Sequence, residues 1–226
     1  MPTRLRIYIL LFLSVCSLSA KAGWPDVPLP PTVKVTHLAN SFSYHGIPMD
    51  IRVFSSHLSM QRILEYYRNQ WHDEYVENQY GPWQQISHKH NKDFITIQIQ
   101  QDANEHAYGR ISIMKIPEQP VKQDYVALGV PLPPGSSVID DILSSDTNGQ
   151  SRVLLAHNKQ SLKFNSRYYI GHYQHKGWNL VMDNVVSRAG HVLAFQKGNK
   201  AIDIVLRTIG NTSYIQLNQT TKKSLF

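Results

Sequence analysis

The sequence predicts an α+β fold arranged as a tandem repeat of two small domains, each with one helix packed on a mostly antiparallel sheet. The prediction starts from residues 27–31, Val-Pro-Leu-Pro-Pro, which recur 103 residues later as residues 130–134. The pair Tyr66-Tyr67 recurs 102 residues later as Tyr168-Tyr169. Three more pairs keep their order at steps of 102 to 108 residues: Ser59 with Ser161, Asn91 with Asn199, and Ile113 with Ile215.

The period is well above the roughly 20–50 residues of a solenoid repeat, so we expect two whole domains rather than a repeat array. The expected boundaries are a signal peptide at 1–22, a first repeat at 23–116, a linker at 117–129, a second repeat at 130–219 and a tail at 220–226. Prolines mark the linker, and the extra residues of the second repeat fall where loops are expected.

The N-terminus has the three parts of a secretory signal in order. Arg4 and Arg6 form a positive start, residues 7–18 are apolar, and Ala20-Lys21-Ala22 is a cleavage motif before Gly23. The apolar run is shorter than the roughly 20 residues of a membrane-spanning helix, which favours cleavage over an uncleaved anchor. We therefore expect a bacterial cell-envelope protein, periplasmic or secreted, with no stable membrane span after cleavage.

The composition of the exported chain excludes several classes of partner and of catalytic chemistry. Cleavage removes three basic residues and no acidic one, so the net charge falls from +7 to +4. The remaining basic residues are scattered rather than gathered in a stripe, so we expect no nucleic-acid partner. The single cysteine, Cys16, lies inside the signal, and Val15 before it is larger than a lipoprotein signal requires. The mature chain then has no disulfide and no thiol catalyst.

The first repeat begins with a proline-rich lead-in that should be extended. Residues 33–38 alternate and predict a strand, and residues 40–46 predict a turn. Residues 47–54 predict a second strand, with Asp50 and Arg52 on one face and apolar side chains on the other. The apolar side chains are Ile47, Met49, Ile51 and Val53.

A helix is expected from a serine cap at 55, 56 or 59 to about Trp71, because apolar residues recur every three or four positions. A hairpin is expected from 83–88 and 94–100, and a further strand at 110–116. The second repeat follows the same order, with its helix at 161–175. Its strands are expected at 138–143, 152–157, 178–182, 191–196, 201–207 and 213–217.

Catalytic and nucleotide-binding motifs are missing from the sequence: it has no nucleophile elbow, phosphate-binding loop, dinucleotide fingerprint or zinc-protease motif. We therefore expect no enzyme activity and no cofactor. His88 and His90 share one face of a strand, and His172 and His175 lie three apart on the second helix, spacings that can bind a metal. No third ligand is implied for either pair, so solvated polar side chains are the favoured interpretation.

Aromatic side chains are the remaining resource for binding, because Tyr and Trp are enriched at interfaces. They are able to line a face that binds glycan or peptide. The alternative, which we favour, is that each tyrosine pair buries one ring in the core and exposes the other. The binding candidates are Tyr66, Tyr67, Trp71, Tyr168, Tyr169 and Trp178.

The second repeat combines a proline-glycine entry at residues 132–138 with a helix carrying Tyr168-Tyr169 and with Gly177-Trp178 after the helix. In this it resembles small exported domains that are common in bacterial envelope proteins, many of them without assigned function. The first repeat resembles them more loosely, since Asn69-Gln70 precede its Trp71 in place of a glycine. The resemblance implies a fold and carries no catalytic motif.

We therefore expect an exported, non-enzymatic protein that binds another envelope or secreted protein, as an accessory of a secretion or surface-assembly system. This function predicts an exposed apolar patch, or an open sheet edge that can accept a strand. One alternative is a module for cell-wall glycan or another small ligand, which predicts a concave pocket with aromatic lining. A metal-dependent hydrolase built on the four histidines is the least favoured.

Overall fold

The computed structural model of the chain describes residues 23–119, 127 and 129–223. The expected signal peptide and most of the expected linker lie outside the described residues. The first half of the chain contains β1 (Lys34–His37), β2 (Ser41–Tyr44), β3 (Ile47–Ser56), α1 (Met60–Trp71), β4 (Tyr75–Tyr80), β5 (Trp83–His90), β6 (Asp93–Gln101) and β7 (Ala107–Lys115). The second half contains β8 (Ser137–Ser145), β9 (Gly149–Asn158), α2 (Leu162–His175), β10 (Asn179–Ser187), β11 (Gly190–Lys197), β12 (Lys200–Ile209) and β13 (Thr212–Lys222).

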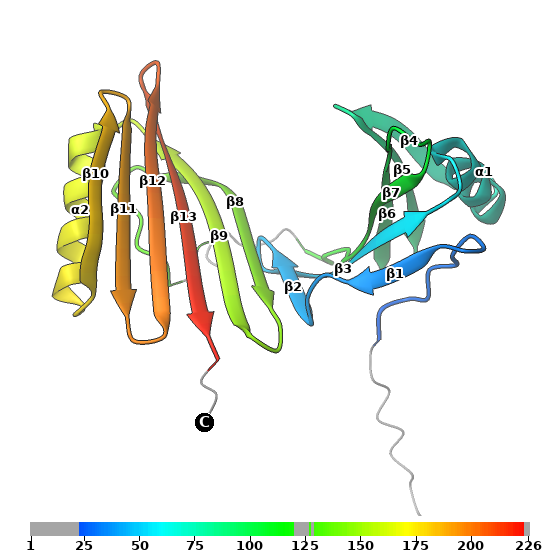
Figure 1. Cartoon of the computed structure of the whole chain (residues 1–226), viewed down its shortest axis with the longest axis horizontal. Coiled ribbons are helices and arrows are strands. Elements are labelled where there is room, and N and C mark those ends of the chain that lie inside the picture. The colour runs from blue at the N-terminus through cyan, green and yellow to red at the C-terminus, as the bar shows by residue number, and fades with distance from the viewer. Residues whose placement is uncertain (1–22, 120–126, 128, 224–226) are drawn as a thin grey trace, which may run out of the picture.

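All of these strands belong to one antiparallel sheet (Figure 1). Its order is β10-β11-β12-β13-β9-β8-β2-β3-β7-β6-β5-β4, and β1 also pairs with β3. Strand makes up 55% of the described residues and helix 13%. The predicted fold class, two small domains that each place a helix on a separate sheet, is therefore wrong: the fold is mostly one large β-sheet.

The strand that joins the two halves is β2, which lies in the middle of the molecule (Figure 1). The sequence predicts a turn at residues 40–46, but residues 41–44 pair with β3 on one side and with β8 on the other. Four residues are too few for an alternating pattern to show. We call the pairing of β2 with β8 the seam between the two halves. The two partners at the seam are distant in sequence, since Phe42 aligns with Ser144. No local pattern reveals such a pairing.

Most of the other predicted elements are confirmed. Both helices are present, and Ser59 and Ser161 are their N-caps. The hairpin of β5 and β6 closes at residues 91–92, and all six strands expected in the second half are present and extend further. β4 was not expected, because residues 75–80 are mostly polar or exposed and show no clear alternation.

Each helix covers its own apolar cluster on the sheet. α1 packs on β5, β6 and β7, and α2 packs on β10, β11 and β12. Side chains alternate between the two faces of a strand, and the register across β3, β2, β8 and β9 keeps that alternation in phase. Both helices therefore lie on the same face of the sheet. The opposite face, which we call the uncovered face, carries no helix or strand among the described residues.

Candidate functional site

The uncovered face of the first half is apolar along β3. Met49, Ile51 and Val53 point to it, whereas Asp50 and Arg52 point to the helix-covered side. The Arg52 Nε donates to the Asp50 carboxylate at 2.6 Å, so the two charges on the covered side neutralise each other. The alternation in this strand is as the sequence predicts. Its apolar side, however, is the one that no helix covers.

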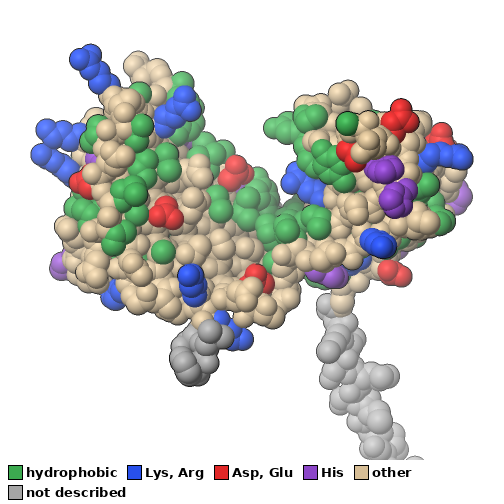
Figure 2. All heavy atoms as spheres, in the orientation of Figure 1, with side chains coloured by type: hydrophobic (Ala, Val, Ile, Leu, Met, Phe, Trp, Pro, Cys, Tyr) green, Lys and Arg blue, Asp and Glu red, His purple; other side chains and the backbone are tan. Residues whose placement is uncertain are grey.

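These side chains line a hollow of about 830 Å³, which we call the trough. It lies on the uncovered face of the first half and reaches the seam with β8. Figure 2 shows hydrophobic side chains gathered where the two halves of the molecule meet. The apolar lining comes from five strands and includes Phe42, Met49, Ile51, Phe94, Met114 and Ile142.

The other end of the trough is polar and aromatic. The Arg110 guanidinium lies 5.4 Å from the centre of the Trp83 ring, and its Nε donates to Gln98 Oε1. The Tyr108 ring meets the Trp83 ring edge-on at 6.2 Å. Arg110 is the one charged residue of the described lining, and no described carboxylate forms an ion pair with it. This end of the trough is therefore positively charged.

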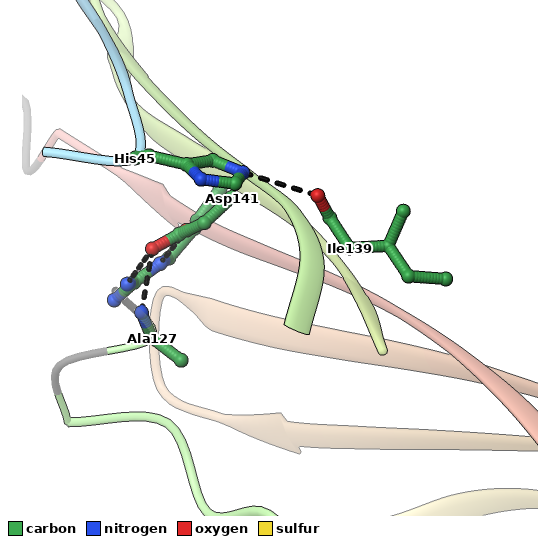
Figure 3. A network of polar contacts seen from close by, with 5 residues as sticks. His45, Ala127, Ile139 and Asp141 are labelled. Atoms are coloured by element: carbon green, nitrogen blue, oxygen red, sulfur yellow. Dashed lines mark hydrogen bonds and ion pairs between the residues drawn. The ribbon is translucent and has the colours of Figure 1, made fainter. Parts of the chain in front are cut away.

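A buried ion pair of the second half, between β8 and β9, lies next to the pairing of β8 with β2 (Figure 3). The Asp141 carboxylate accepts bonds from Arg152 Nε and Nη2 and from the Ala127 N–H, each at 2.7 Å. Burial by itself raises the pKa of Asp141, but Arg152 and the Ala127 amide outweigh it and hold that pKa below its ordinary value. From the turn after β2, the His45 N–H donates to the Asp141 carbonyl at 2.8 Å, and His45 Nε2 lies 3.1 Å from the Ile139 carbonyl.

β10 forms one edge of the sheet, and nearly all of its side chains are exposed. Its only charged residue is Asp183, whose carboxylate lies 2.6 Å from His191 Nε2. One side of its backbone pairs with β11, and no described strand pairs with the other side. Its large exposed apolar side chains, between 48% and 67% exposed, are Val181, Met182, Val185 and Val186.

The predicted aromatic candidates lie on and around the two helices, away from the trough. Tyr67, Trp71 and Tyr169 are buried in the cores, while the other three are partly buried and pack against them: Tyr66, Tyr168 and Trp178. Burial raises the pKa of Tyr67 and of Tyr169 far above the ordinary tyrosine value. Their hydroxyls therefore stay neutral and do not act as bases at neutral pH.

The predicted histidine pairs do not converge on further ligands. His88 is buried and stacks on Trp71 at 5.0 Å, with its Nδ1 2.6 Å from the Glu74 carbonyl oxygen. The ring of His90 is 6.2 Å from that of His88. His172 is partly buried, and burial lowers its pKa, whereas His175 is exposed. In the described part of the chain no three potential ligands are close enough to hold a metal ion.

A second hollow, of about 890 Å³, lies beside the start of α2. Lys159, Lys163 and Arg188 contribute to its lining, and all three are exposed. The Lys159 ammonium donates to the Thr212 hydroxyl at 3.0 Å. Solvated basic side chains beside a helix N-terminus do not define a ligand. The apolar lining of the trough is mostly half-buried, and its arginine, although exposed, is held by Trp83 and Gln98, so the trough is the better-defined site.

Sequence reasoning did not find the trough or the open edge of β10. A signal for the trough is present in residues 47–53, where the apolar side of the strand lies opposite a charged pair. A signal for the edge is present in residues 180–186, Leu-Val-Met-Asp-Asn-Val-Val, where apolar residues occupy both faces of one strand. Neither pattern says which face or edge remains free.

The chain shares no significant similarity with any family model, curated protein or solved structure compared with it. Within the described ranges, neither helix has the length and apolar character needed to cross a bilayer. The functional argument therefore depends on the trough and on the edge strand.

Proposed function

We propose that the chain is an exported, non-enzymatic protein that binds another protein of the bacterial cell envelope by accepting a strand at β10. The observation that supports this most directly is the open edge of β10 with its exposed apolar side chains. Unpaired N–H and C=O groups along an edge form a template for another chain. In such complexes the main-chain bonds supply affinity, and the side chains supply specificity. The signal expected at residues 1–22 supports a partner in the envelope.

The other edge strand, β4, is less suited to this role. It has six residues, whereas β10 has nine. Its Glu77 forms a two-bond pair with Arg68 of α1, at 2.5 and 2.8 Å. Charges and short length are two of the ways in which proteins protect an edge from pairing. β10 also carries one charge, Asp183, but it is longer and exposes four large apolar side chains. Burying them would contribute up to roughly 1.5–3 kcal/mol each before the cost of association is subtracted.

The test is affinity capture by the mature chain, residues 23–226, from its native envelope extract, in parallel with two variants. Val185→Lys changes β10 and Val76→Lys changes β4, and the two valines are equally exposed at 67% and 66%. A stoichiometric partner that is lost with Val185→Lys and kept with Val76→Lys supports strand addition at β10. A partner that both variants keep, or the absence of any partner, contradicts the proposal.

The trough favours small-ligand binding as a second function. Its volume lies within the roughly 300–1,000 Å³ of small-molecule sites, and its apolar lining with a few polar groups is typical of them. Cell-wall glycan is the less suitable ligand, because its many hydroxyl groups need polar partners. The metal-dependent hydrolase has no support from the described histidines, since neither pair lies near a third ligand.

A further inference from the structure

We propose that the trough binds one fatty acid, with the carboxylate at Arg110 and the acyl chain running towards the seam of the two halves. The proposal builds on the small-ligand alternative. It does not depend on docking at β10, because the two surfaces share no residue. Three features support it: a continuous apolar row, a lone cation, and the distance between them.

The apolar row crosses four neighbouring strands. Phe42 of β2 aligns with Met49 of β3, Met49 aligns with Met114 of β7, and Met114 aligns with Phe94 of β6. Residues that align across an antiparallel pair point to the same face, so these side chains stand side by side on the uncovered face. Methionine adapts its shape to an apolar guest. Ile142 of β8 extends the apolar lining across the seam.

The lone cation lies on the same face and further along β7. Arg110 precedes Met114 by four residues, which is about 13 Å along a strand. Trp83 and Gln98 hold the guanidinium, and within the described residues the hydrogen bond to Gln98 uses only its Nε. The two Nη groups are thereby available to a carboxylate, whose oxygens match the guanidinium fork.

The remaining polar groups favour a fatty acid over other occupants. Among the described residues no acidic side chain lines the trough, so a cationic amphiphile finds no opposite charge there. The neighbouring amides already satisfy one another, since Gln98 Nε2 donates to Gln85 Oε1 at 2.9 Å. A peptide would bring backbone N–H and C=O groups that need partners along its whole length. An acyl chain brings none, and its single polar group lies at one end.

The experiment is isothermal titration of the mature chain with dodecanoate below its micelle-forming concentration. We expect one saturable site. Arg110→Gln should weaken binding about tenfold or more, because it removes a charge-assisted contact. The matched control is Arg207→Gln, which changes an exposed arginine on the uncovered face of the second half and should leave the affinity unchanged. Val185→Lys in β10 should also leave it unchanged, so failure of docking at β10 and failure of this proposal remain distinguishable.

A second probe separates charge from apolar character. Dodecyltrimethylammonium has the same tail and the opposite charge, and it should bind about tenfold more weakly than dodecanoate. Circular dichroism checks that each variant is folded. The proposal is overturned by the absence of saturable dodecanoate binding, by equal binding of the two amphiphiles, or by equal losses in Arg110→Gln and Arg207→Gln. Tight binding of an acidic amphipathic peptide without dodecanoate binding would also overturn it and assign the trough to a protein.

Discussion

The two helix-covered cores have matching frameworks. Ser59 and Ser161 cap their helices in the same way, each hydroxyl accepting the N–H three residues ahead, at 3.4 and 3.1 Å. Tyr67 and Tyr169, which are 102 residues apart, are both buried at the centre of their helices. The same positions along each helix therefore perform the same structural tasks.

The cores differ in polarity one turn earlier. Ile63 of α1 is purely apolar, whereas the corresponding residue of α2 is Asn165. Asn165 and Asn158 of β9 exchange two side-chain hydrogen bonds, at 3.0 and 3.1 Å, in a buried site. In the first half Ser56 stands in place of Asn158. A helix can therefore carry an amide in its buried stripe when the strand supplies a complementary amide.

The uncovered faces of the two halves differ more than the cores. In the first half this face carries the trough and its apolar row. In the second half the same face of β13 is polar, with Tyr214, Gln216, Asn218 and Thr220. Similar helix-covered cores thus carry opposite faces of different composition, with the apolar row in the first half and a polar β13 in the second. We expect the ligand site to exist once in the molecule.

The largest expected effect concerns the buried carboxylates, Asp141 in the second half and Asp50 in the first. Asp141→Asn should cost about 3 kcal/mol of unfolding free energy at pH 7, because Arg152 loses its charged partner in a buried site. The folded pKa of Asp141 is lowered, so this contribution is present above about pH 4 and is lost as the pH falls further. Urea unfolding at pH 7 and pH 3 measures it.

Asp50→Asn is the counterpart in the first half. It tests whether only the carboxylate next to the seam affects the strand β8. Arg52 lies on the same strand as Asp50, so we expect that substitution to weaken its own half without loosening β8. The two chains, Asp141→Asn and unsubstituted, should differ less in unfolding free energy at pH 3 than at pH 7. An equal difference at both pH values would show that the ionised Asp141 carboxylate is not the source of the stability.

The second effect tests the buried amide pair. Asn165→Ala should destabilise the chain by about 2 kcal/mol, because Asn158 keeps a buried amide with fewer partners. Combining Asn158→Ser with Asn165→Ile copies the residues of the first half and should recover most of the loss. A double-mutant cycle by thermal unfolding measures the coupling. Strictly additive losses would show that the two amides act independently.

A smaller effect, in the opposite direction, concerns the matched tyrosines. The Tyr169 hydroxyl is buried and has no hydrogen-bond partner among the described residues. Tyr169→Phe should therefore stabilise the chain by about 1 kcal/mol, since the unpaired hydroxyl no longer has to be buried. Tyr67→Phe is the matched control, because the Tyr67 hydroxyl is not among these unpaired buried groups, and it should change little. Chemical denaturation measures the unfolding free energy of both variants. A loss of stability in Tyr169→Phe would contradict the prediction and indicate that the hydroxyl has a hydrogen-bond partner in solution.

The smallest effect on stability is expected on the uncovered faces. Val53 lines the trough and Val205 lies on the uncovered face of the second half, and each is 39% exposed. Changing either to Ser should alter stability by no more than about 0.5 kcal/mol. Only Val53→Ser should weaken dodecanoate binding. Equal effects of the two variants on binding would remove the functional difference between the faces.

The elements that the sequence predicts well are those set by near neighbours. The helix caps at Ser59 and Ser161 depend on residues three positions away, and the β5–β6 hairpin depends on its own turn. The candidate site was not predictable in this way. The residues that build it, from Phe42 to Phe94, come together only when four strands are aligned.

By itself the sequence determined the two helices, most strands and the alternation in residues 47–54, because contacts within a few residues decide local structure. The tertiary structure decided that β2 joins both halves into one sheet, since Phe42 finds Ser144 only after the chain has folded back. It also decided which face of β3 remains open. Alternation defines two faces of a strand, but the packing of α1 on the neighbouring strands β5, β6 and β7 decides which face of the sheet is covered and which remains exposed to solvent.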